Sequence, residues 1–361
     1  MRYFLVTGGA GFIGSNFIHH VLNATTDINI INLDALTYAG NLENLSGLDT
    51  DHRYKFVHGN INDSSILEII FSDFPIEKVI HFAAESHVDR SISDPLIFIQ
   101  TNVMGTSNLL LHSERYWSDL SSNQKSTFRF LHVSTDEVFG SLEKDEPAFT
   151  EDTPYAPNSP YAASKASSDH LVRAYFHTYG LPAIITNCSN NYGPFQNPEK
   201  LIPLVISNAV QGKPIPVYGD GLQIRDWLFV EDHCEAILSV LNSGMPGQSF
   251  NIGGNNQPTN LTIIHTICEI LDKLLPHSDF SPHSNLIRFV KDRPGHDRRY
   301  AMNITKITDQ VGWAPKESLE SGLHKTIHWY LENNVWVSNA LNTKSHKNWL
   351  KNNYTKRGAQ S

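Results

Sequence analysis

The chain has 361 residues, of which 40% are hydrophobic and 18% charged, so it can bury a sizeable core as two domains or as one large α/β domain with an appended lobe. Its formal net charge of −9 disfavours nucleic acid and anionic membranes as partners, and requires local cations for any anionic ligand. Three widely spaced cysteines, no metal-ligand spacing, no signal-peptide pattern and no apolar run of about 20 residues predict a cytoplasmic protein without disulfides, metal or membrane span.

Short β-branched runs alternate with amphipathic stretches in the first half of the chain. The expected strands cover residues 3–7, 28–33, 54–58, 78–82, 128–134 and 183–187. The expected helices cover residues 12–22, 64–71, 96–116 and 161–179. This alternation predicts an α/β fold with a doubly wound parallel sheet that binds ligands at the carboxyl ends of its strands.

The rhythm of the sequence changes near residue 191. Residues 1–190 are expected to form a dinucleotide-binding domain, and residues 191–335 mainly a smaller substrate-binding lobe. Whether some segments of the lobe return to the main sheet is left open. Residues 336–361 are polar and are expected to form a solvated tail.

A glycine-rich turn follows the first expected strand, with Gly8, Gly11 and Gly14 at the start of the first helix. Small residues let the backbone approach a pyrophosphate, and the helix N-terminus offers free N–H groups. Asp34 ends the second strand, where a carboxylate accepts hydrogen bonds from ribose hydroxyls and repels a 2′-phosphate. Together these features predict a Rossmann-type dinucleotide site rather than a glycine turn that binds no ligand. They favour NAD over NADP as the cofactor.

Tyr161 and Lys165 are four residues apart in an expected helix and therefore lie on one face. A tyrosine is ordinarily a weak base, with a pKa of about 10. A nearby ammonium and the positive nicotinamide are expected to lower the pKa of Tyr161, so that it can take a proton from a sugar hydroxyl. Without the glycine-rich turn earlier in the sequence, a Tyr–Lys pair on the protein surface with no catalytic role would be the better interpretation.

Three polar residues end the fifth expected strand: Thr135, Asp136 and Glu137. A threonine hydroxyl there can bond a substrate hydroxyl beside the tyrosine. Simple oxidation needs no further carboxylates, whereas an elimination needs both an acid and a base. The alternative is a pair of solvated acids at a strand end.

Eight motifs carry a resemblance to the extended short-chain dehydrogenase/reductases and, within them, to the dTDP-glucose 4,6-dehydratases. They cover residues 7–14, 82–91, 134–140, 159–165, 190–194, 200–203, 225–227 and 292–300. The resemblance implies that Tyr161, with Lys165 and Thr135, removes the C4 hydroxyl proton while hydride passes to tightly bound NAD. It implies that Glu137 removes the C5 proton, that Asp136 protonates the departing C6 hydroxyl, and that the hydride returns to C6.

The resemblance also implies two sets of binding residues. The cofactor set is Gly8, Gly11, Phe12, Ile13, Gly14, Asp34, Asn60, Ile61, Ala83, Thr101, Tyr161, Lys165 and Asn191. The substrate set is Ser86, Thr135, Asn190, Lys200, Leu201, Arg225, Asn260, Arg293, His296 and Tyr300. Arginines suit a nucleotide diphosphate because guanidinium binds phosphate bidentately, although a surface salt bridge is an equal alternative for Arg225 or Arg293.

The chain departs from the family pattern at two places. Asn60 stands where the family has an aspartate that meets the adenine amino group, and Ala162 replaces a serine after the tyrosine. An Asn oxygen can still accept that hydrogen bond, so NAD binding should survive. The family forms homodimers through two helices of each subunit, which would be residues 96–116 and 161–179 here.

Three other functions remain open. A nucleotide-sugar epimerase or decarboxylase would use the same tyrosine and lysine but no adjacent Asp–Glu pair. A 4,6-dehydratase for a UDP or GDP sugar would differ in the base pocket. An NAD-binding regulatory protein would need none of the catalytic residue types, all of which are present.

Overall fold

The structure is a computed structural model that describes residues 2–292 and 297–343. Within these residues, a seven-stranded sheet has the order β10-β6-β5-β4-β1-β2-β3, and every pair of neighbours is parallel. Its strands are β1 (Arg2–Thr7), β2 (Ile28–Asp34), β3 (Tyr54–His58), β4 (Ile76–His81), β5 (Arg129–Thr135), β6 (Ala183–Cys188) and β10 (Ser249–Ile252). The six strands expected from the sequence and the doubly wound α/β fold are therefore confirmed.

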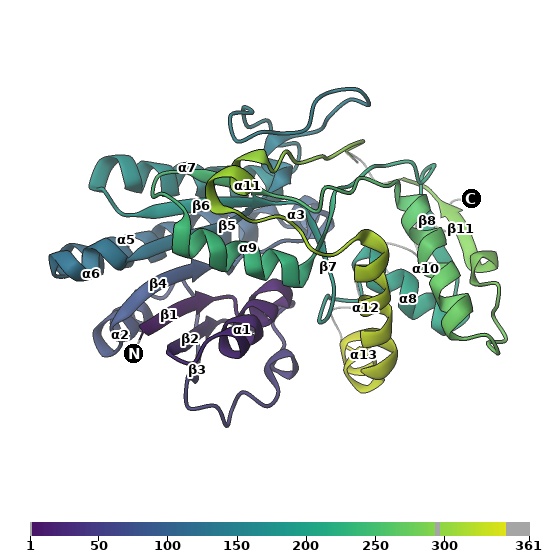
Figure 1. Ribbon diagram of the computed structural model, residues 1–361, viewed down its shortest axis with the longest axis horizontal. Coiled ribbons are helices and arrows are strands. Elements are labelled where there is room, and N and C mark those ends of the chain that lie inside the picture. The colour runs from purple at the N-terminus through teal and green to yellow at the C-terminus, as the bar shows by residue number, and fades with distance from the viewer. Residues whose placement is uncertain (1, 293–296, 344–361) are drawn as a thin grey trace.

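Helices cover both faces of this sheet (Figure 1). Successive strand residues point to opposite faces, so Phe4 and Val6 join one core while Leu5 between them joins the other. The first face is covered by α1 (Phe12–Ala24), α9 (Val230–Ser243) and α11 (Thr305–Val311). The second face is covered by α2 (Ser64–Asp73), α5 (Thr106–Asp119) and α7 (Pro160–Tyr179), with α6 (Ser122–Thr127) following α5. The strand order reverses between β1 and β4, which is where such sheets bind dinucleotides.

The helix expected over residues 96–116 is helical throughout but irregular. After the short α3 (Val88–Ser93) come α4 (Pro95–Phe98), the π-helical segment η2 (Ile99–Gly105) and then α5. In η2, Asn102 accepts a 2.8 Å hydrogen bond from the Glu85 amide and donates a 2.8 Å bond to Ser164 Oγ. The π-helical segment thus fastens α7 to the loop that follows β4, at the carboxyl edge of the sheet.

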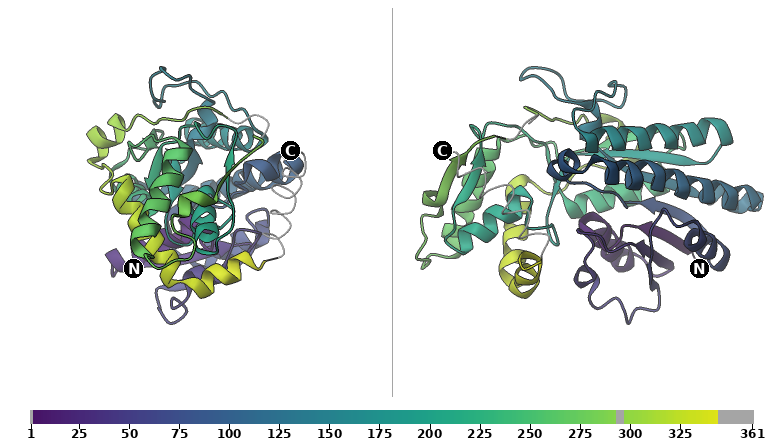
Figure 2. Two further views of the ribbon diagram at one scale, coloured as in Figure 1. Left: turned by 90° about the vertical axis from the view of Figure 1, so that its right-hand side faces the viewer. Right: turned by 180° about the vertical axis from the view of Figure 1, so that it is seen from behind.

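A second lobe stands beside the sheet, at the right of Figure 1 and from two other directions in Figure 2. Its apolar core includes Ile206, Val217, Ile267 and Ile327. The lobe contains α8 (Leu201–Val210), α10 (Asn260–Leu274), α12 (Leu319–Glu332), α13 (Asn334–Leu341) and the strand pairs β8 (Ile215–Tyr218) with β11 (Ile287–Val290) and β7 (Asn190–Tyr192) with β9 (Trp227–Phe229). Three 3₁₀ turns complete the described chain: η1 (Leu42–Leu45), η3 (Asp136–Phe139) and η4 (His283–Leu286).

Three elements after residue 191 lie outside this lobe's core. Strand β10 returns to the edge of the main sheet, α9 packs on α1, and α11 packs on α9 and β10. The expected polar tail is wrong for its first residues, because residues 336–341 belong to α13 and Trp336 is buried in the lobe core. The rest of that tail, from residue 344, lies outside the described residues. No helix in the described part of the chain is long and apolar enough to cross a membrane.

Candidate active site

The glycine-rich turn between β1 and α1 packs too closely for side chains at two of its glycines. Gly8 has a φ of +74°, and a Cβ there would lie 2.6 Å from the Ala83 amide nitrogen. A Cβ on Gly14 would lie 2.4 Å from the Gly8 carbonyl oxygen. The turn therefore packs tightly against the loop after β4, and its backbone is exposed to whatever occupies the neighbouring cavity.

The carboxylate of Asp34 lies at the carboxyl end of β2, beside this turn. One oxygen accepts a 2.8 Å hydrogen bond from the Ala10 amide, and the other accepts a 2.8 Å bond from the Leu36 amide. Burial raises the pKa of Asp34, opposed by these two hydrogen bonds. The carboxylate is thus held in a fixed orientation, as a ribose-binding group requires.

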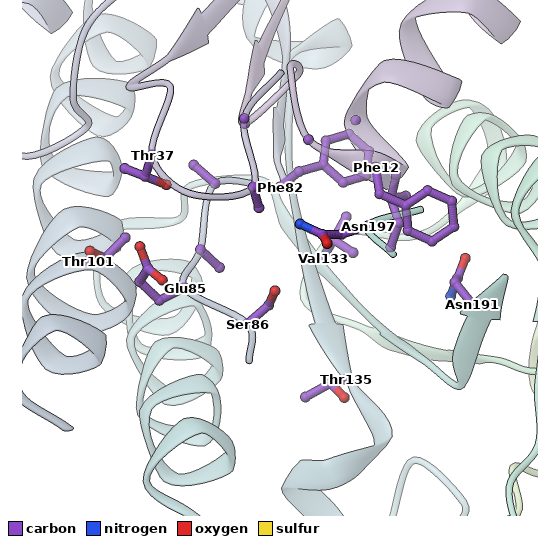
Figure 3. Close-up of a pocket in the computed structure, with 18 of the residues that line it drawn as sticks. Phe12, Thr37, Phe82, Glu85, Ser86, Thr101, Val133, Thr135, Asn191 and Asn197 are labelled. Atoms are coloured by element: carbon purple, nitrogen blue, oxygen red, sulfur yellow. The ribbon is translucent and has the colours of Figure 1, made fainter. Parts of the chain in front are cut away.

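A cavity of about 310 Å³ opens along the carboxyl edge of the sheet (Figure 3). All of the residues predicted to bind NAD line it: Gly8, Gly11, Phe12, Ile13, Gly14, Asp34, Asn60, Ile61, Ala83, Thr101, Tyr161, Lys165 and Asn191. In Figure 3, Thr101 lies on one side of this cavity and Phe12 and Asn191 on the other. The residues present therefore fit a dinucleotide that runs from Asp34 to Tyr161.

The departure at Asn60 has a visible consequence. Its side-chain oxygen accepts hydrogen bonds of 2.9 Å from the Asn62 amide and 3.2 Å from Asn62 Nδ2. Asn60 lines the cavity, but this oxygen is already engaged by its own loop. Its neutral oxygen is a weaker acceptor for an adenine amino group than a carboxylate would be.

The three polar residues after β5 line the same cavity. Thr135 caps the 3₁₀ turn η3 by accepting a 3.3 Å hydrogen bond from the Glu137 amide, and it donates a 3.2 Å bond to Asp136. Burial raises the pKa of Asp136 well above its usual range, and the neighbouring charge of Glu137 adds to this effect. The shift favours the protonated form of Asp136, as a proton donor requires.

Tyr161 and Lys165 also line the cavity, but their electrostatics differ from the expectation. Burial raises the pKa of Tyr161 well above its ordinary value, and the charge of Glu137 raises it further. The Lys165 ammonium donates a 2.8 Å hydrogen bond to the Val133 carbonyl on β5. Burial thus sets the direction of the shift for the protein groups, and the lowering by Lys165 together with the positive nicotinamide stays a prediction. Thr135 opposes the shift through a hydrogen bond to the tyrosine hydroxyl.

A second cavity of about 180 Å³ adjoins the first on the side of the second lobe. Six predicted substrate residues line it: Ser86, Asn190, Lys200, Leu201, Arg225 and Asn260. Ser86, Glu137, Asn190 and Lys200 line both cavities. The side-chain oxygens of Asn190 and Asn260 are buried and have no hydrogen-bond partner among the described residues. Buried amide oxygens without partners are suited to a polar ligand in this cavity.

Arg225 is buried, so it is not a surface ion pair. It donates 2.8 Å hydrogen bonds to the carbonyl oxygens of Ile224 and Asp297, and its guanidinium lies 4.3 Å from the centre of the Tyr300 ring. Tyr300 donates a hydrogen bond to the Asp297 carboxylate and supports Arg225 without lining either cavity. Arg293 and His296 lie outside the described residues.

Glu199 lines both cavities but was not predicted from the sequence. Its side chain is almost completely buried, with one oxygen 3.3 Å from Arg90 Nη2 and the other 3.5 Å from His87 Nε2. Burial raises the pKa of Glu199. Its position directly before Lys200 was the one available signal, because the contacts to Arg90 and His87 join segments far apart in the chain.

This fold and this site define an NAD-dependent enzyme of the extended short-chain dehydrogenase/reductase class. Residues 5–326 match the family model described as GDP-mannose 4,6 dehydratase. The chain is 53% identical over 358 residues to the dTDP-glucose 4,6-dehydratase of Salmonella typhimurium, covering 97% of this chain and 98% of the relative. The chain belongs to the dTDP-glucose 4,6-dehydratase family.

Solved structures agree with this assignment. The dTDP-glucose 4,6-dehydratase DesIV of Streptomyces venezuelae, solved with NAD bound, matches with a TM-score of 0.84 and 44% identity over 94% of this chain and 100% of that one. A UDP-glucose 4-epimerase of Thermotoga maritima matches with a TM-score of 0.79 and 28% identity over 92% of this chain and 99% of that one. The backbone is thus common to dehydratases and epimerases, and side chains must distinguish them.

Proposed function

We propose that this protein converts dTDP-glucose into dTDP-4-keto-6-deoxyglucose and water, with NAD regenerated in every cycle. The observation that carries the proposal is the pair Asp136 and Glu137. Asp136 is buried and its pKa is raised well above the usual range, while Glu137 lines both the cofactor cavity and the second cavity. An elimination needs one proton donor and one proton acceptor at adjacent carbons, and an epimerisation at C4 needs neither.

Each side chain has a role in this reaction. Bound NAD would supply the acceptor for the C4 hydride, a positive ring that favours the Tyr161 phenolate, and the hydride for C6. Tyr161 takes the C4 hydroxyl proton, with the ammonium of Lys165 and the hydroxyl of Thr135 beside it. Glu137 takes the C5 proton, which the C4 ketone has made acidic, and Asp136 gives its proton to the departing C6 hydroxyl. Glu137 returns a proton to C5 when the hydride is delivered to C6, and the proton left on Tyr161 balances the one that Asp136 has lost.

The second cavity would hold the nucleotide diphosphate. Buried Arg225 supplies the local positive charge that an anionic ligand requires in a chain of net charge −9, and Asn190 and Asn260 supply polar groups nearby. The DesIV structure with NAD and a dTDP ligand supports the assignment of this nucleotide. Residues 1–190 would then form the cofactor domain, and residues 191–335 mainly the substrate lobe.

Product analysis of a nucleotide-sugar panel tests the function. The purified protein would be incubated with dTDP-glucose, UDP-glucose, UDP-galactose and GDP-mannose, and the products identified by NMR. We expect a 4-keto-6-deoxy sugar with a new C6 methyl group from dTDP-glucose, with much slower turnover of the others. A C4 epimer without a methyl group would overturn the proposal in favour of the epimerase.

A homodimer is also proposed, from an apolar surface on α3, α4 and η2. Leu96 and Met104 are 76% and 60% exposed, and Ile92, Ile97 and Ile99 are exposed beside them. These five residues, here called the η2 patch, form an apolar surface of the kind that marks interfaces. Its helices pack against α7, so a twofold axis there would build the expected bundle.

A cytoplasmic location is proposed because the three cysteines are free and buried.

A further inference from the structure

The Ala10 peptide, at the centre of the cofactor turn, is held from both sides. Its N–H donates a 2.8 Å hydrogen bond to Asp34 Oδ2. Its carbonyl accepts a 3.0 Å hydrogen bond from Asn44 Nδ2 and a 2.9 Å bond from the Asn41 amide. The conformation of the turn therefore depends on a loop, residues 41–45, that does not touch the cavity.

The second lobe reaches this loop directly. Trp336 on α13 donates a 2.9 Å hydrogen bond from its indole nitrogen to Asn44 Oδ1, and both side chains are buried. Three hydrogen bonds thus link Trp336, through Asn44 and the backbone of Ala10, to Asp34. Each donor in this chain points toward the Asp34 carboxylate. Buried bonds of this kind are costly to break, because each partner is left without water.

Helices α12 and α13 also pack against a second segment that lines the cavity. Phe195, which lines it, packs edge-on against Trp329 of α12 with ring centres 4.8 Å apart, and against Trp336 at 6.0 Å. Tyr330 of α12 donates a hydrogen bond to the carbonyl of Gln196, the next lining residue. Helices α12 and α13 therefore contact both the 41–45 loop, which holds the cofactor turn, and the lining residues Phe195 and Gln196.

We propose that α13 is a latch on the cofactor, in which Trp336 and Asn44 act as positioning residues that slow the release of NAD. A reaction that takes a hydride and returns it to the same sugar requires the cofactor to stay bound throughout. The chain from Trp336 fixes the carboxylate that would hold the adenosine ribose. This inference depends on NAD binding alone, and it holds whichever nucleotide sugar is the substrate.

The test measures NAD release from the full-length protein loaded with NAD. Trp336→Phe keeps an aromatic ring but removes the indole N–H, and Asn44→Leu removes both side-chain hydrogen bonds at similar volume. We expect each variant to release NAD about three- to tenfold faster, the effect of one buried hydrogen bond. The double variant should be no faster than Asn44→Leu, because the chain is already broken. Asn339→Ala, which removes the exposed 2.8 Å bond from α13 to Glu43, is the matched control and should leave the rate unchanged.

Two outcomes would overturn the latch. One is unchanged NAD release in folded Trp336→Phe protein, and the other is strictly additive effects of the two substitutions. If Trp336→Phe lowers stability, the rise in melting temperature on adding NAD is compared with that of the unaltered protein. A latch predicts a smaller rise for the variant, whereas a purely structural role of Trp336 predicts the same rise. A failed nucleotide-sugar panel would contradict the dehydratase function but would leave these measurements intact.

Discussion

The Nε2 atom of His132 lies 3.3 Å from the Lys165 ammonium and 3.2 Å from the Asp169 carboxylate. All three side chains are buried beneath the active site. Burial lowers the pKa of His132 to about 4, with the charge of Lys165 adding to the effect, so the imidazole is neutral. The ammonium and the carboxylate therefore meet at one nitrogen of a neutral ring.

Asp169→Asn should move the alkaline limb of the pH–rate profile to lower pH. Burial lowers the pKa of Lys165 to about 8, and the negative charge of Asp169 opposes that shift. Removing this charge lowers the pKa further, so Lys165 loses its proton, and with it the charge that favours the phenolate, at a lower pH. The measurement is kcat against pH from 6 to 10.

Ser134→Ala is the matched control for this prediction. It removes the 2.8 Å hydrogen bond that Ser134 donates to Asp169 but keeps the charge, so the alkaline limb should stay in place. Other groups facing Lys165 are the buried His81 and Cys188. An unchanged limb in Asp169→Asn would mean that Asp169 does not support the lysine charge.

Asp34→Asn should narrow the preference for NAD over NADP. The substitution keeps the shape of the side chain but removes the charge that would repel a 2′-phosphate. We expect the ratio of NADP to NAD dissociation constants to fall about tenfold, as measured by titration calorimetry. Glu43→Gln, which removes a carboxylate outside the cavity, should leave the ratio unchanged. Equal binding of NAD and NADP by the unaltered protein would contradict the role of Asp34.

Charges placed in the η2 patch should dissociate the homodimer. Leu96→Glu with Met104→Glu puts two carboxylates into the most exposed part of that apolar surface. Light scattering behind size-exclusion chromatography should then report a monomer, since an unpaired charge at an interface core is costly. Val335→Glu, at an apolar position 70% exposed on α13, is the control and should remain dimeric. A monomeric unaltered protein would exclude the dimer at once.

Local sequence patterns predicted the sheet well, because each expected strand carries its own β-branched run and the glycine-rich turn marks the end of the first strand. They also brought Gly8, Asp34 and Tyr161 to one cavity, because parallel strands end at the same edge. The π-helical turns of η2 leave no such local pattern, since residues 96–116 have the apolar spacing of an ordinary helix.

Contacts between distant segments were not predictable. The hydrogen bond between Trp336 and Asn44 joins residues 292 positions apart, and a tryptophan in a polar stretch gave no sign of its partner. The burial that raises the pKa of Tyr161 was not predictable for the same reason, because it comes from residues brought together by the fold.

Glu137→Gln should oxidise C4 but stall before water is lost. The amide keeps the shape of the side chain and cannot take the C5 proton, so turnover should fall by about two to four decades. A single turnover should then show a lasting rise in the absorbance of reduced nicotinamide. Glu143→Gln, at an exposed carboxylate outside the cavities, should behave like the unaltered enzyme. Normal turnover in Glu137→Gln would remove this residue from the elimination.

The path of the C4 hydrogen separates dehydration from every reaction on the same fold that leaves C6 untouched. If the hydride taken from C4 is returned to C6 of the same sugar, substrate deuterated at C4 should give a product deuterated in its new methyl group. A mixture of labelled and unlabelled substrate should give no crossover between molecules, because the cofactor stays bound between the two transfers.

The C5 hydrogen should behave differently, because it passes through Glu137, a carboxylate whose proton exchanges with water. Unlabelled substrate in heavy water should therefore gain deuterium at C5, and the migrating hydride should stay unlabelled. Mass spectrometry and NMR of the methyl group distinguish the two positions. An epimerase would leave its label at C4 and form no methyl group. A methyl group without the C4 label would exclude internal hydride return, even if the product were the expected 4-keto-6-deoxy sugar.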